Sequence, residues 1–286
     1  MSNDSSPPAV TRFAPSPTGR LHLGHAYSAL FSEAQAKQAG GRFLLRIEDI
    51  DPGRCRAEFE DAIYEDLSWL GLTWEAPVRR QSEHMDDYAK ALSTLQEIEV
   101  LYPCFCTRKD IQSTIQTHHN SYFGPDGLLY PGTCRGLSQD ERKTRESAGE
   151  AFALRLDMSK ALKGISDTLQ WNDLAHGKIT ATPEIFGDVV LARKNTPTSY
   201  HLAVTLDDHL QGVTLVTRGE DLLPSTHVHR LLQELLGLHA PSYHHHPLLT
   251  DYEGRRYAKR NRSLSLKALR DEGKSPDQVR QMAGLE

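Results

Sequence analysis

Short apolar runs alternate along the chain with longer segments whose apolar residues recur every three or four positions. Residues 9–13 and 42–47 have the pattern of buried strands, and residues 24–31 and 84–101 have the pattern of helices. This order of strands and helices predicts an α/β fold with a doubly wound parallel sheet. Ligands of such sheets bind at the carboxyl ends of the strands, where residues 25 and 48 are expected to lie.

Turn-forming residues and changes of pattern divide the chain into parts. A helix running to residue 70 is expected to begin at Asp51 and Pro52, which suit an N-cap and a first helical position. Glycine and proline clusters then replace the alternation and predict an inserted subdomain. After it we expect a mixed segment at 199–208, a strand at 213–218 and a helix at 226–236. The predicted parts are a mobile leader at 1–8, a first catalytic half at 9–103, the inserted subdomain at 104–194, and a second catalytic half at 195–286.

Residues 12–25 carry the most specific chemistry. Prolines and a glycine enforce a turn after the first strand, and His22, Gly24 and His25 stand at the start of the following helix. The backbone N–H groups and the positive end of the helix dipole favour an anion at this place. Two imidazoles there can donate hydrogen bonds to a departing phosphate, so the pattern indicates nucleotide chemistry.

Composition narrows the class of protein without deciding its ligand. The chain has 286 residues, with 33 Lys and Arg against 38 Asp and Glu, so any contact with RNA must come from local basic patches. We find no apolar run that approaches a membrane span and no secretory signal at the start. Four cysteines are too few for a disulfide framework, which favours a reducing, cytoplasmic location.

Three of the cysteines could form a metal site. Cys104, Cys106 and Cys134 are thiols that a loop could bring together, and Tyr130 lies between them in sequence. Zinc prefers four donors in a closed tetrahedron, yet the spacing by itself fits core thiols equally well. His118 and His119 compete for the fourth position, and Cys55 is distant in sequence. The run His244-His245-His246 is a weaker metal candidate, because consecutive strand residues cannot all point to one side; one of them is expected to line the nucleotide pocket.

Residues 12–25 resemble the "HIGH" signature of the class I aminoacyl-tRNA synthetases, and the lead-in Arg-Phe-Ala-Pro-Ser-Pro-Thr-Gly resembles the glutamyl branch. Residues 45–51 resemble the Leu-Arg-Ile-Glu-Asp-Thr-Asp segment of that branch. Residues 255–262 match the position of its "KMSKS" loop, although Arg256 replaces the first lysine and the serine is missing. The resemblance covers roughly residues 10–268 and includes an insertion that carries zinc, with Tyr130 as the implied fourth ligand.

The resemblance implies a Rossmann-type fold that activates glutamate with ATP. A carboxylate beside the pocket can hold the ammonium of an amino acid, and Arg12 can form a bidentate pair with the side-chain carboxylate of the substrate. The implied glutamate-binding residues are Arg12, Ala14, Ser16, Glu48, Tyr200 and Arg218. The implied ATP-binding residues are His22, Gly24, His25 and Lys259, and of these His22, His25 and Lys259 are the implied catalytic residues. Mg²⁺ is expected with the ATP, together with one structural Zn²⁺.

The end of the sequence bears on the acceptor. Lys259 is followed by 27 residues (286 − 259), fewer than the 50 or so that a separate domain needs, so we expect no anticodon-binding domain. This resembles a shortened subgroup of the family that transfers glutamate to the queuosine base in the anticodon loop of tRNA(Asp). A compact enzyme that charges the 3′ end of tRNA, a small-molecule nucleotidyltransferase and a non-catalytic zinc and RNA-binding module remain alternatives. The expected partners are ATP, L-glutamate and tRNA(Asp), with no membrane and a monomeric state.

Overall fold

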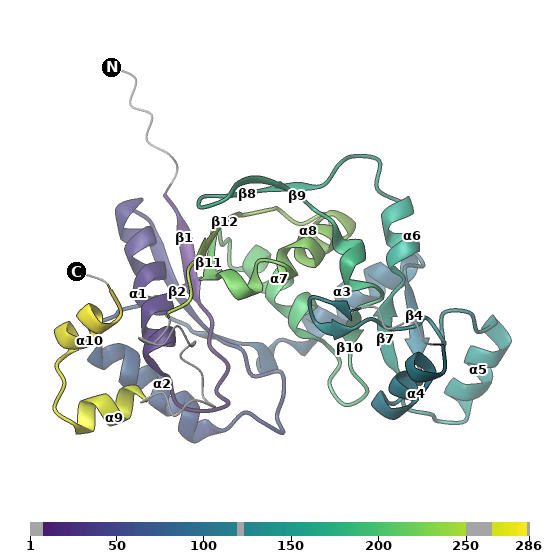
Figure 1. Cartoon of the computed structure of the whole chain (residues 1–286), viewed down its shortest axis with the longest axis horizontal. Coiled ribbons are helices and arrows are strands. Elements are labelled where there is room, and N and C mark those ends of the chain that lie inside the picture. Colours follow the sequence, from purple (N-terminus) through teal and green to yellow (C-terminus); the bar gives the residue numbers. More distant parts are fainter. Residues whose placement is uncertain (1–7, 119–122, 250–264, 285–286) are drawn as a thin grey trace, which may run out of the picture.

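The strands of the N-terminal half form a parallel ladder. The computed structural model describes residues 8–118, 123–249 and 265–284. Strands β1 (Val10–Phe13), β2 (Arg42–Ile47) and β3 (Arg79–Arg80) pair in parallel in that order. Helices α1 (Leu23–Gln38) and α2 (Ala57–Trp69) connect them, which confirms the predicted βαβα order (Figure 1).

The second catalytic strands complete the sheet. Strands β11 (Leu215–Gly219), β12 (Ser242–His246) and β8 (Gln170–Asp173) are parallel, and β9 (Gly177–Thr180) runs antiparallel at the edge. The two groups of strands meet where the Thr214 amide donates to the Val10 carbonyl oxygen at 3.0 Å. Helices α7 (Tyr200–Leu210) and α8 (Ser225–Leu235) belong to this half, so the doubly wound sheet is confirmed.

Most residues from 101 to 192, apart from β8 and β9, form a separate layer at the right of Figure 1. Its antiparallel sheet has the order β10-β7-β4, formed by Val190–Ala192, Ala153–Leu156 and Leu101–Cys104. Helix α3 (Met85–Glu97) leads into it. Its remaining elements are α4 (Arg108–His118), α5 (Gln139–Ser147), α6 (Met158–Lys163), and the short hairpin of β5 (Phe123–Gly124) and β6 (Gly127–Leu128).

The C-terminal helices pack on the first catalytic half. Leu266 and Leu269 of α9 (Leu266–Asp271) and Val279 of α10 (Pro276–Met282) are buried in the same core as Leu30 and Ile47. Burial of such side chains stabilises a fold by about 1.5 to 3 kcal/mol each. The last described residues are therefore a part of the same hydrophobic core as β2 and α1, and they lie beside α1 (Figure 1).

Two local predictions were wrong. The helix predicted from Asp51 and Pro52 begins instead at Ala57, because residue 51 closes a turn: its carbonyl oxygen accepts from the amides of Arg54 and Cys55. Its carboxylate also accepts from Arg54 Nε at 2.8 Å. The segment predicted to be mixed at 199–208 is almost entirely helical, since it forms most of α7.

In the part of the chain that the structure describes, no helix combines the length and the apolar character that a membrane span requires.

Asp66 on α2 gives a testable effect of pH on stability. Its side chain is buried, and burial raises its pKa from 3.8 to about 6, although Arg270 at 3.5 Å opposes the shift. The folded state therefore holds the proton more tightly than the unfolded state. Below pH 4 both states are protonated and there is no penalty; the penalty grows between pH 4 and 6 and is constant above.

Asp66→Asn removes this titration. We expect the variant to gain about 1 to 3 kcal/mol of unfolding free energy at pH 7 relative to its effect at pH 4. Urea denaturation at the two pH values measures the difference. Equal effects of the substitution at both values would contradict the proposed cost of the buried charge.

Candidate active site

His22 and His25 shape the start of α1. His22 is the N-cap residue, and its Nδ1 accepts from the Gly24 amide at 3.2 Å. Nδ1 of His25 accepts from the His22 amide at 3.1 Å, so the two side chains form a capping box at the start of α1. The ring centroids lie 3.8 Å apart. Because Nδ1 is an acceptor in both rings, the proton of each neutral imidazole sits on Nε2.

Gly24 is needed for this arrangement. A Cβ atom at this position would come within 3.1 Å of Cε1 and 3.2 Å of Nδ1 of His22. The absence of a side chain thus lets the His22 ring lie over the first turn of α1. The local sequence His-x-Gly-His fixes both donors at the positive end of the helix dipole.

Arg12, near the end of β1, forms a buried ion pair with Asp208. Its Nε and Nη2 donate to the carboxylate of Asp208 on α7 at 2.9 and 3.3 Å, and Nη1 donates to the Thr217 carbonyl oxygen at 3.1 Å. Burial by itself raises the pKa of Asp208, but the charges of Arg12 and Arg46 outweigh burial and lower it. The Nε–Nη2 edge of Arg12 therefore faces Asp208, and two of its five N–H protons remain to meet a substrate.

Glu48 follows β2 directly and lies beside this ion pair. Its carboxylate accepts from Nη2 of Arg46, which is fully buried, at 3.2 Å. Burial raises the pKa of Glu48, although Arg46 and Arg12 pull it down. This carboxylate is largely shielded from water, and the positive charges near it do not fully offset the cost of burial. The ammonium group of a substrate would therefore stabilise its charged form. The Glu48 amide also donates to the Pro15 carbonyl oxygen at 3.0 Å, which brings the loop carrying Ala14 and Ser16 to this edge.

Arg218 on β11 is held on three sides by acceptors. Its Nη2 donates to Thr226 Oγ1 at 2.6 Å, and Nε donates to Nε2 of His245 at 3.1 Å. Nη1 lies 3.2 Å from Nδ1 of His229 and 3.4 Å from the hydroxyl of Tyr200. Arg218 as a whole is 5% exposed, and none of these partners is a carboxylate, so its positive charge is left for an acidic ligand to balance.

The histidines around Arg218 form two chains that end in aspartates. His245 Nδ1 bonds to Asp173, which leaves its Nε2 as an acceptor for Arg218. On the other side, Nε2 of His229 bonds to Nδ1 of His201 at 3.2 Å, and Nε2 of His201 bonds to Asp126 at 3.2 Å. A single assignment of tautomers satisfies both chains with neutral imidazoles that accept on the side of Arg218.

Electrostatics favours the same neutral state. Burial and the positive charge of Arg218 lower the pKa of His245 to about 4, although Asp173 opposes the shift. Burial and Arg218 also lower the pKa of His229 well below its ordinary value. These rings therefore remain uncharged acceptors near neutral pH, as the positioning of a guanidinium requires.

The histidine run on β12 alternates as predicted. His244 Nδ1 contacts Gln35 at 3.3 Å and His246 Nε2 contacts Ser28 at 3.2 Å, both on α1. His245 points to the opposite face, toward Arg218. The three side chains are thus split between two faces of the sheet and do not converge on one metal ion.

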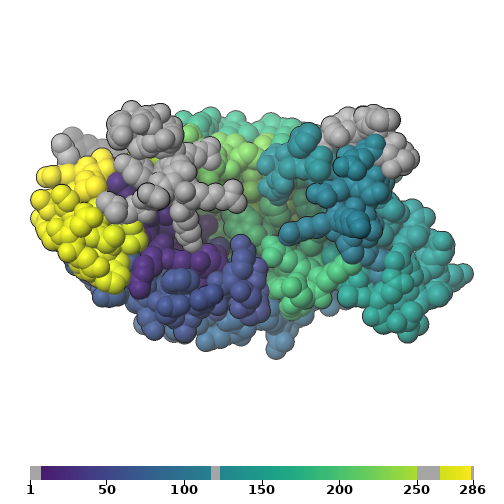
Figure 2. Space-filling model, turned by 60° about the horizontal axis from the view of Figure 1, so that its bottom comes forward, coloured from purple at the N-terminus to yellow at the C-terminus, as the bar shows by residue number. Residues whose placement is uncertain are grey.

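Tyr200 begins α7, and its hydroxyl lies 3.4 Å from Nη1 of Arg218. Burial raises the pKa of this hydroxyl, and the positive charge of Arg218 opposes the shift. In the space-filling view, the purple N-terminal segment lies between the yellow C-terminal helices and the green second half (Figure 2).

Lys259 and the remainder of the basic run lie outside the described residues. The described chain resumes at residue 265, next to the segment that carries His22 and His25, where the Leu266 amide donates to the Leu21 carbonyl oxygen at 2.9 Å.

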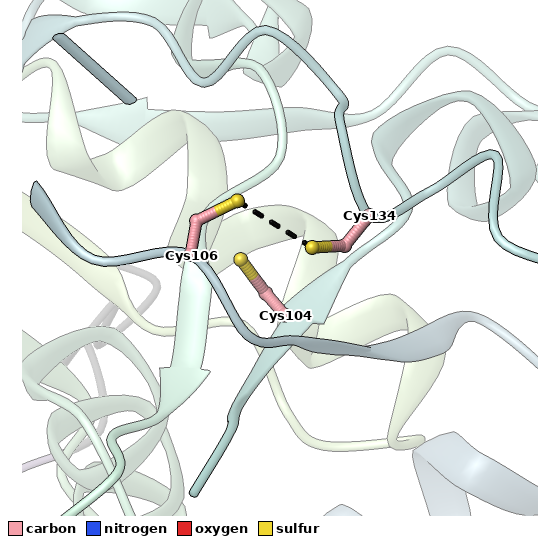
Figure 3. A group of neighbouring side chains, drawn as sticks. All are labelled: Cys104, Cys106 and Cys134. Carbon is pink, nitrogen blue, oxygen red and sulfur yellow. Dashed lines mark hydrogen bonds between the residues drawn. The ribbon is translucent and has the colours of Figure 1, made fainter. Parts of the chain in front are cut away.

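Three thiols gather in the inserted part, as Figure 3 shows. The Sγ atoms of Cys104, Cys106 and Cys134 lie within 4.8 Å of one another, and those of Cys106 and Cys134 are 3.5 Å apart. Ligands of a tetrahedral zinc ion with Zn–S distances of about 2.3 Å are separated by about 3.8 Å. The hydroxyl of Tyr130 lies 3.5 Å from Cys106 Sγ and accepts from the Cys134 amide at 2.8 Å.

The donor set therefore fits a zinc ion. Burial raises the pKa of the Cys106 thiol, so a cation is needed to hold its thiolate form. Cys55 is half-buried and is not a member of the cluster. The side chain of His118 and all of His119 lie outside the described part of the chain. Tyr130 is thus the candidate fourth ligand that the structure describes.

Sequence reasoning missed the residues that hold the site together. Asp208 binds Arg12 and Arg46, and Asp207 accepts from Arg79 Nε and from Gln81 at 2.8 Å each. Thr226 and His229, which hold Arg218, were also missed. The available signal was the pair Asp207-Asp208 inside an apolar segment, because buried carboxylates of this kind need cationic partners.

The fold and this arrangement of residues define a class of protein. The sequence model of the family described as "tRNA synthetases class I (E and Q), catalytic domain" matches residues 8–285, and the chain belongs to this family. It is 46% identical to a "Glutamyl-Q tRNA(Asp) synthetase" from Rhodobacter capsulatus over 96% of this chain and 100% of that protein. It is 42% identical to a protein of the same name from Nitratidesulfovibrio vulgaris over 92% of this chain and 81% of the relative.

Longer relatives match as well. The chain is 38% identical to a "Glutamate--tRNA ligase" from Aquifex aeolicus, of which it spans 54%. Among solved structures, a glutamate tRNA ligase from Elizabethkingia meningosepticum in complex with its amino acid superimposes with a TM-score of 0.80 at 28% identity. That match covers 96% of this chain and 60% of the ligase chain, so this protein spans about three fifths of the solved relative.

Proposed function

We propose that this protein activates L-glutamate with ATP and transfers it to the queuosine base in the anticodon loop of tRNA(Asp). The observation that carries the proposal is the 46% identity to a relative named for that activity, along that relative's full length. The relatives that are named glutamate–tRNA ligases match over 54 to 58% of their length. The site supplies partners for both charged ends of glutamate and for the phosphates of ATP.

In the activation step, a carboxylate oxygen of glutamate attacks the α-phosphorus of ATP. The bond to the β-phosphate oxygen breaks, pyrophosphate leaves, and glutamyl-adenylate forms. The Nε2–H groups of His22 and His25 and the N-terminus of α1 stabilise the charge that develops on the phosphates. Lys259 supplies a further positive charge, and Mg²⁺ bound to the triphosphate neutralises part of its charge.

Glutamate is positioned by groups at three strand ends. Arg218 is the proposed partner of the substrate side chain, since its acceptors leave its positive charge uncompensated. Glu48 is the proposed partner of the ammonium group, because burial leaves its carboxylate short of positive charge. Arg12, the loop at Ala14 and Ser16, and Tyr200 beside Arg218 complete the proposed site.

In the transfer step, a hydroxyl oxygen of the acceptor attacks the carbonyl carbon of glutamyl-adenylate. An ester bond forms, the bond between the carbonyl carbon and the phosphate oxygen breaks, AMP leaves, and the hydroxyl proton passes to solvent. Cys104, Cys106, Tyr130 and Cys134 would hold a zinc ion in the inserted part, where it would support the fold and take no part in the reaction. We place the protein in the cytoplasm, where its thiols stay reduced, and propose that it acts as a monomer.

Labelled glutamate tests the proposal directly. The protein is incubated with Mg-ATP and intact total tRNA, which is then cut so that the anticodon-loop fragment separates from the 3′ end. We expect glutamate-dependent exchange of pyrophosphate into ATP, and label on the anticodon-loop fragment of tRNA(Asp). Label confined to the 3′ end would instead establish a compact tRNA-charging enzyme. A protein that binds tRNA without exchange would be a non-catalytic module.

Two substitutions test the phosphate-binding residues. We expect His25→Ala and Lys259→Ala each to slow pyrophosphate exchange at least tenfold, or about 1.4 kcal/mol of transition-state stabilisation. His25 also caps α1, so the melting temperature of that variant must be measured beside its exchange rate. Unchanged exchange in a folded variant would remove that residue from the mechanism.

A further inference from the structure

A chain of hydrogen bonds connects the inserted part to Arg218. It begins at Asp126, in the turn between β5 and β6, whose carboxylate lies 3.2 Å from Nε2 of His201 on α7. Nδ1 of His201 lies 3.2 Å from Nε2 of His229 on α8, and Nδ1 of His229 lies 3.2 Å from Nη1 of Arg218. Asp126 is therefore joined by three successive hydrogen bonds to the proposed partner of the substrate side chain.

The groups at the two ends give this chain one direction. The carboxylate of Asp126 only accepts hydrogen bonds, and the guanidinium group of Arg218 only donates them. A neutral imidazole has one donor and one acceptor nitrogen, so His201 and His229 both carry their proton on Nε2. The Nδ1 lone pair of His229 then faces Arg218. A donor in place of Asp126 would favour the opposite tautomers and turn an N–H group of His229 against Arg218.

Packing holds the first imidazole without choosing its tautomer. The ring of His201 makes edge contacts with the rings of Phe186 and Tyr200, at centroid distances of 5.9 and 5.5 Å. His201 and His229 are both buried. Packing fixes the orientation of such a ring, whereas the position of its proton is set by its hydrogen-bond partners. The choice of tautomer is therefore left to the polar groups at the ends of the chain.

Close packing also fixes the turn that carries Asp126. A Cβ atom at Gly124 would come within 2.6 Å of the Ile185 carbonyl oxygen, so glycine lets β5 approach the short 3₁₀ helix Pro183–Phe186. Phe186 at the end of this helix contacts the ring of His201. The turn and the first imidazole of the chain thus rest on the same element.

The two chains that end at Arg218 differ in their exposure. Asp173, at the outer end of one chain, has a fully buried side chain, whereas the side chain of Asp126 is 62% exposed. An exposed pair of this kind contributes little to stability, so the fold does not depend on the carboxylate of Asp126. A substitution of Asp126 can therefore change the hydrogen bonding of Arg218 without unfolding the protein.

We propose that Asp126 is a positioning residue for glutamate. Through His201 and His229 it keeps a hydrogen-bond acceptor facing Arg218, and so holds the guanidinium group in the orientation that meets the substrate carboxylate. The inference rests on the proposed function, because it requires Arg218 to bind glutamate. It gives the inserted part a role in substrate binding in addition to that of its thiol cluster.

Three substitutions of Asp126 change the end of the chain in different ways. Asp126→Asn keeps an acceptor oxygen, Asp126→Ala removes the acceptor, and Asp126→Lys replaces the acceptor by a donor. Asp167→Lys is the matched control, because Asp167 is another exposed aspartate of the inserted part. Each variant is assayed by pyrophosphate exchange with glutamate and ATP varied separately, and its melting temperature is recorded.

We expect KM for glutamate to rise at least tenfold in Asp126→Lys, because an N–H group of His229 then opposes that of Arg218. The rise should be about threefold in Asp126→Ala and less than twofold in Asp126→Asn. KM for ATP, kcat and the melting temperature should stay close to the wild type, as should every property of Asp167→Lys. The direction is diagnostic, since glutamate has a net negative charge and a general electrostatic effect of the new lysine would lower KM.

Two kinetic results would overturn the proposal. One is a KM for glutamate in Asp126→Lys that is lower than in the wild type or within twofold of it. The other is an equal rise of KM for ATP together with a lower melting temperature, which would assign Asp126 to the fold.

Nitrogen NMR of protein with labelled histidines tests the same chain without a substrate. The chemical shifts of the two ring nitrogens show which of them carries the proton. We expect the proton on Nε2 of His201 and His229 in the wild type, and a shift toward Nδ1 in Asp126→Lys. A wild-type His229 with its proton on Nδ1 would overturn the proposal. A wild-type protein with the expected tautomers but without glutamate-dependent exchange would instead reject the proposed function, while confirming that an acceptor faces Arg218.

Discussion

Arg218→Lys should lower kcat/KM for glutamate in pyrophosphate exchange by at least a factor of 100, or about 2.7 kcal/mol. The guanidinium group of Arg218 donates simultaneously to Thr226 and His245 and lies against His229, so its plane is fixed from three sides. An ammonium group is a point charge that cannot reproduce this planar fork. The fixed acceptors of Arg218 would be left unpaired, and the substrate carboxylate would lose the charge-assisted hydrogen bond of the guanidinium group.

The effect should appear mainly in KM for glutamate and much less in KM for ATP. Arg145→Lys is a matched control, because Arg145 lies on α5 in the inserted part and pairs with Glu150 at the surface. Both variants should keep the wild-type melting temperature within a few degrees. A folded Arg218→Lys protein with unaltered glutamate dependence would show that another cation holds the substrate.

Cys106→Ser should abolish zinc binding. The three Sγ atoms and the Tyr130 hydroxyl already lie close to tetrahedral spacing, so the loss of one thiolate leaves a donor set too weak to retain the ion. Because a structural zinc site contributes directly to folding, we expect the melting temperature to fall by at least about 5 °C. Metal analysis by atomic emission should change from one zinc per chain to none.

Cys55→Ser controls for the loss of a thiol, since Cys55 is half-buried outside the cluster and should keep both zinc and stability. Tyr130→Phe tests the fourth ligand. If the phenol coordinates zinc, this variant should lose the ion to a chelator faster than the wild type does. Equal rates of loss would assign the fourth position to another donor, and a zinc-free wild-type protein would contradict the site as a whole.

The elements that the sequence predicted best are those whose apolar residues recur with one clear spacing. Strands β1, β2 and β11 are apolar runs between turn residues, and α8 carries an amphipathic stripe. Helix α7 did not stand out because it is buried on nearly all sides and contains two aspartates, so no polar face marks it as a helix. The two-residue strand β3 is too short to show any period.

The candidate site divides in the same way. Arg12, Glu48, Tyr200 and Arg218 could be picked out by resemblance because each stands within or near a recognisable segment. Their supporting partners could not, since Arg12 and Asp208 are separated by 196 residues and nothing in a single sequence joins them. The capping geometry of His22 and His25 likewise depends on backbone angles that the motif implies without specifying.

The two aspartates of α7 also bear on how the chain assembles. Arg12, Arg46 and Arg79 come from three neighbouring strands, and Asp207 and Asp208 serve as their buried counter-charges. A nascent chain that has reached residue 199 contains all three cations and neither anion. We expect the arginine-bearing strands to stay apart while the chain is being synthesised. They should come together in one late step, when α7 has emerged from the ribosome and its two aspartates pair with the arginines.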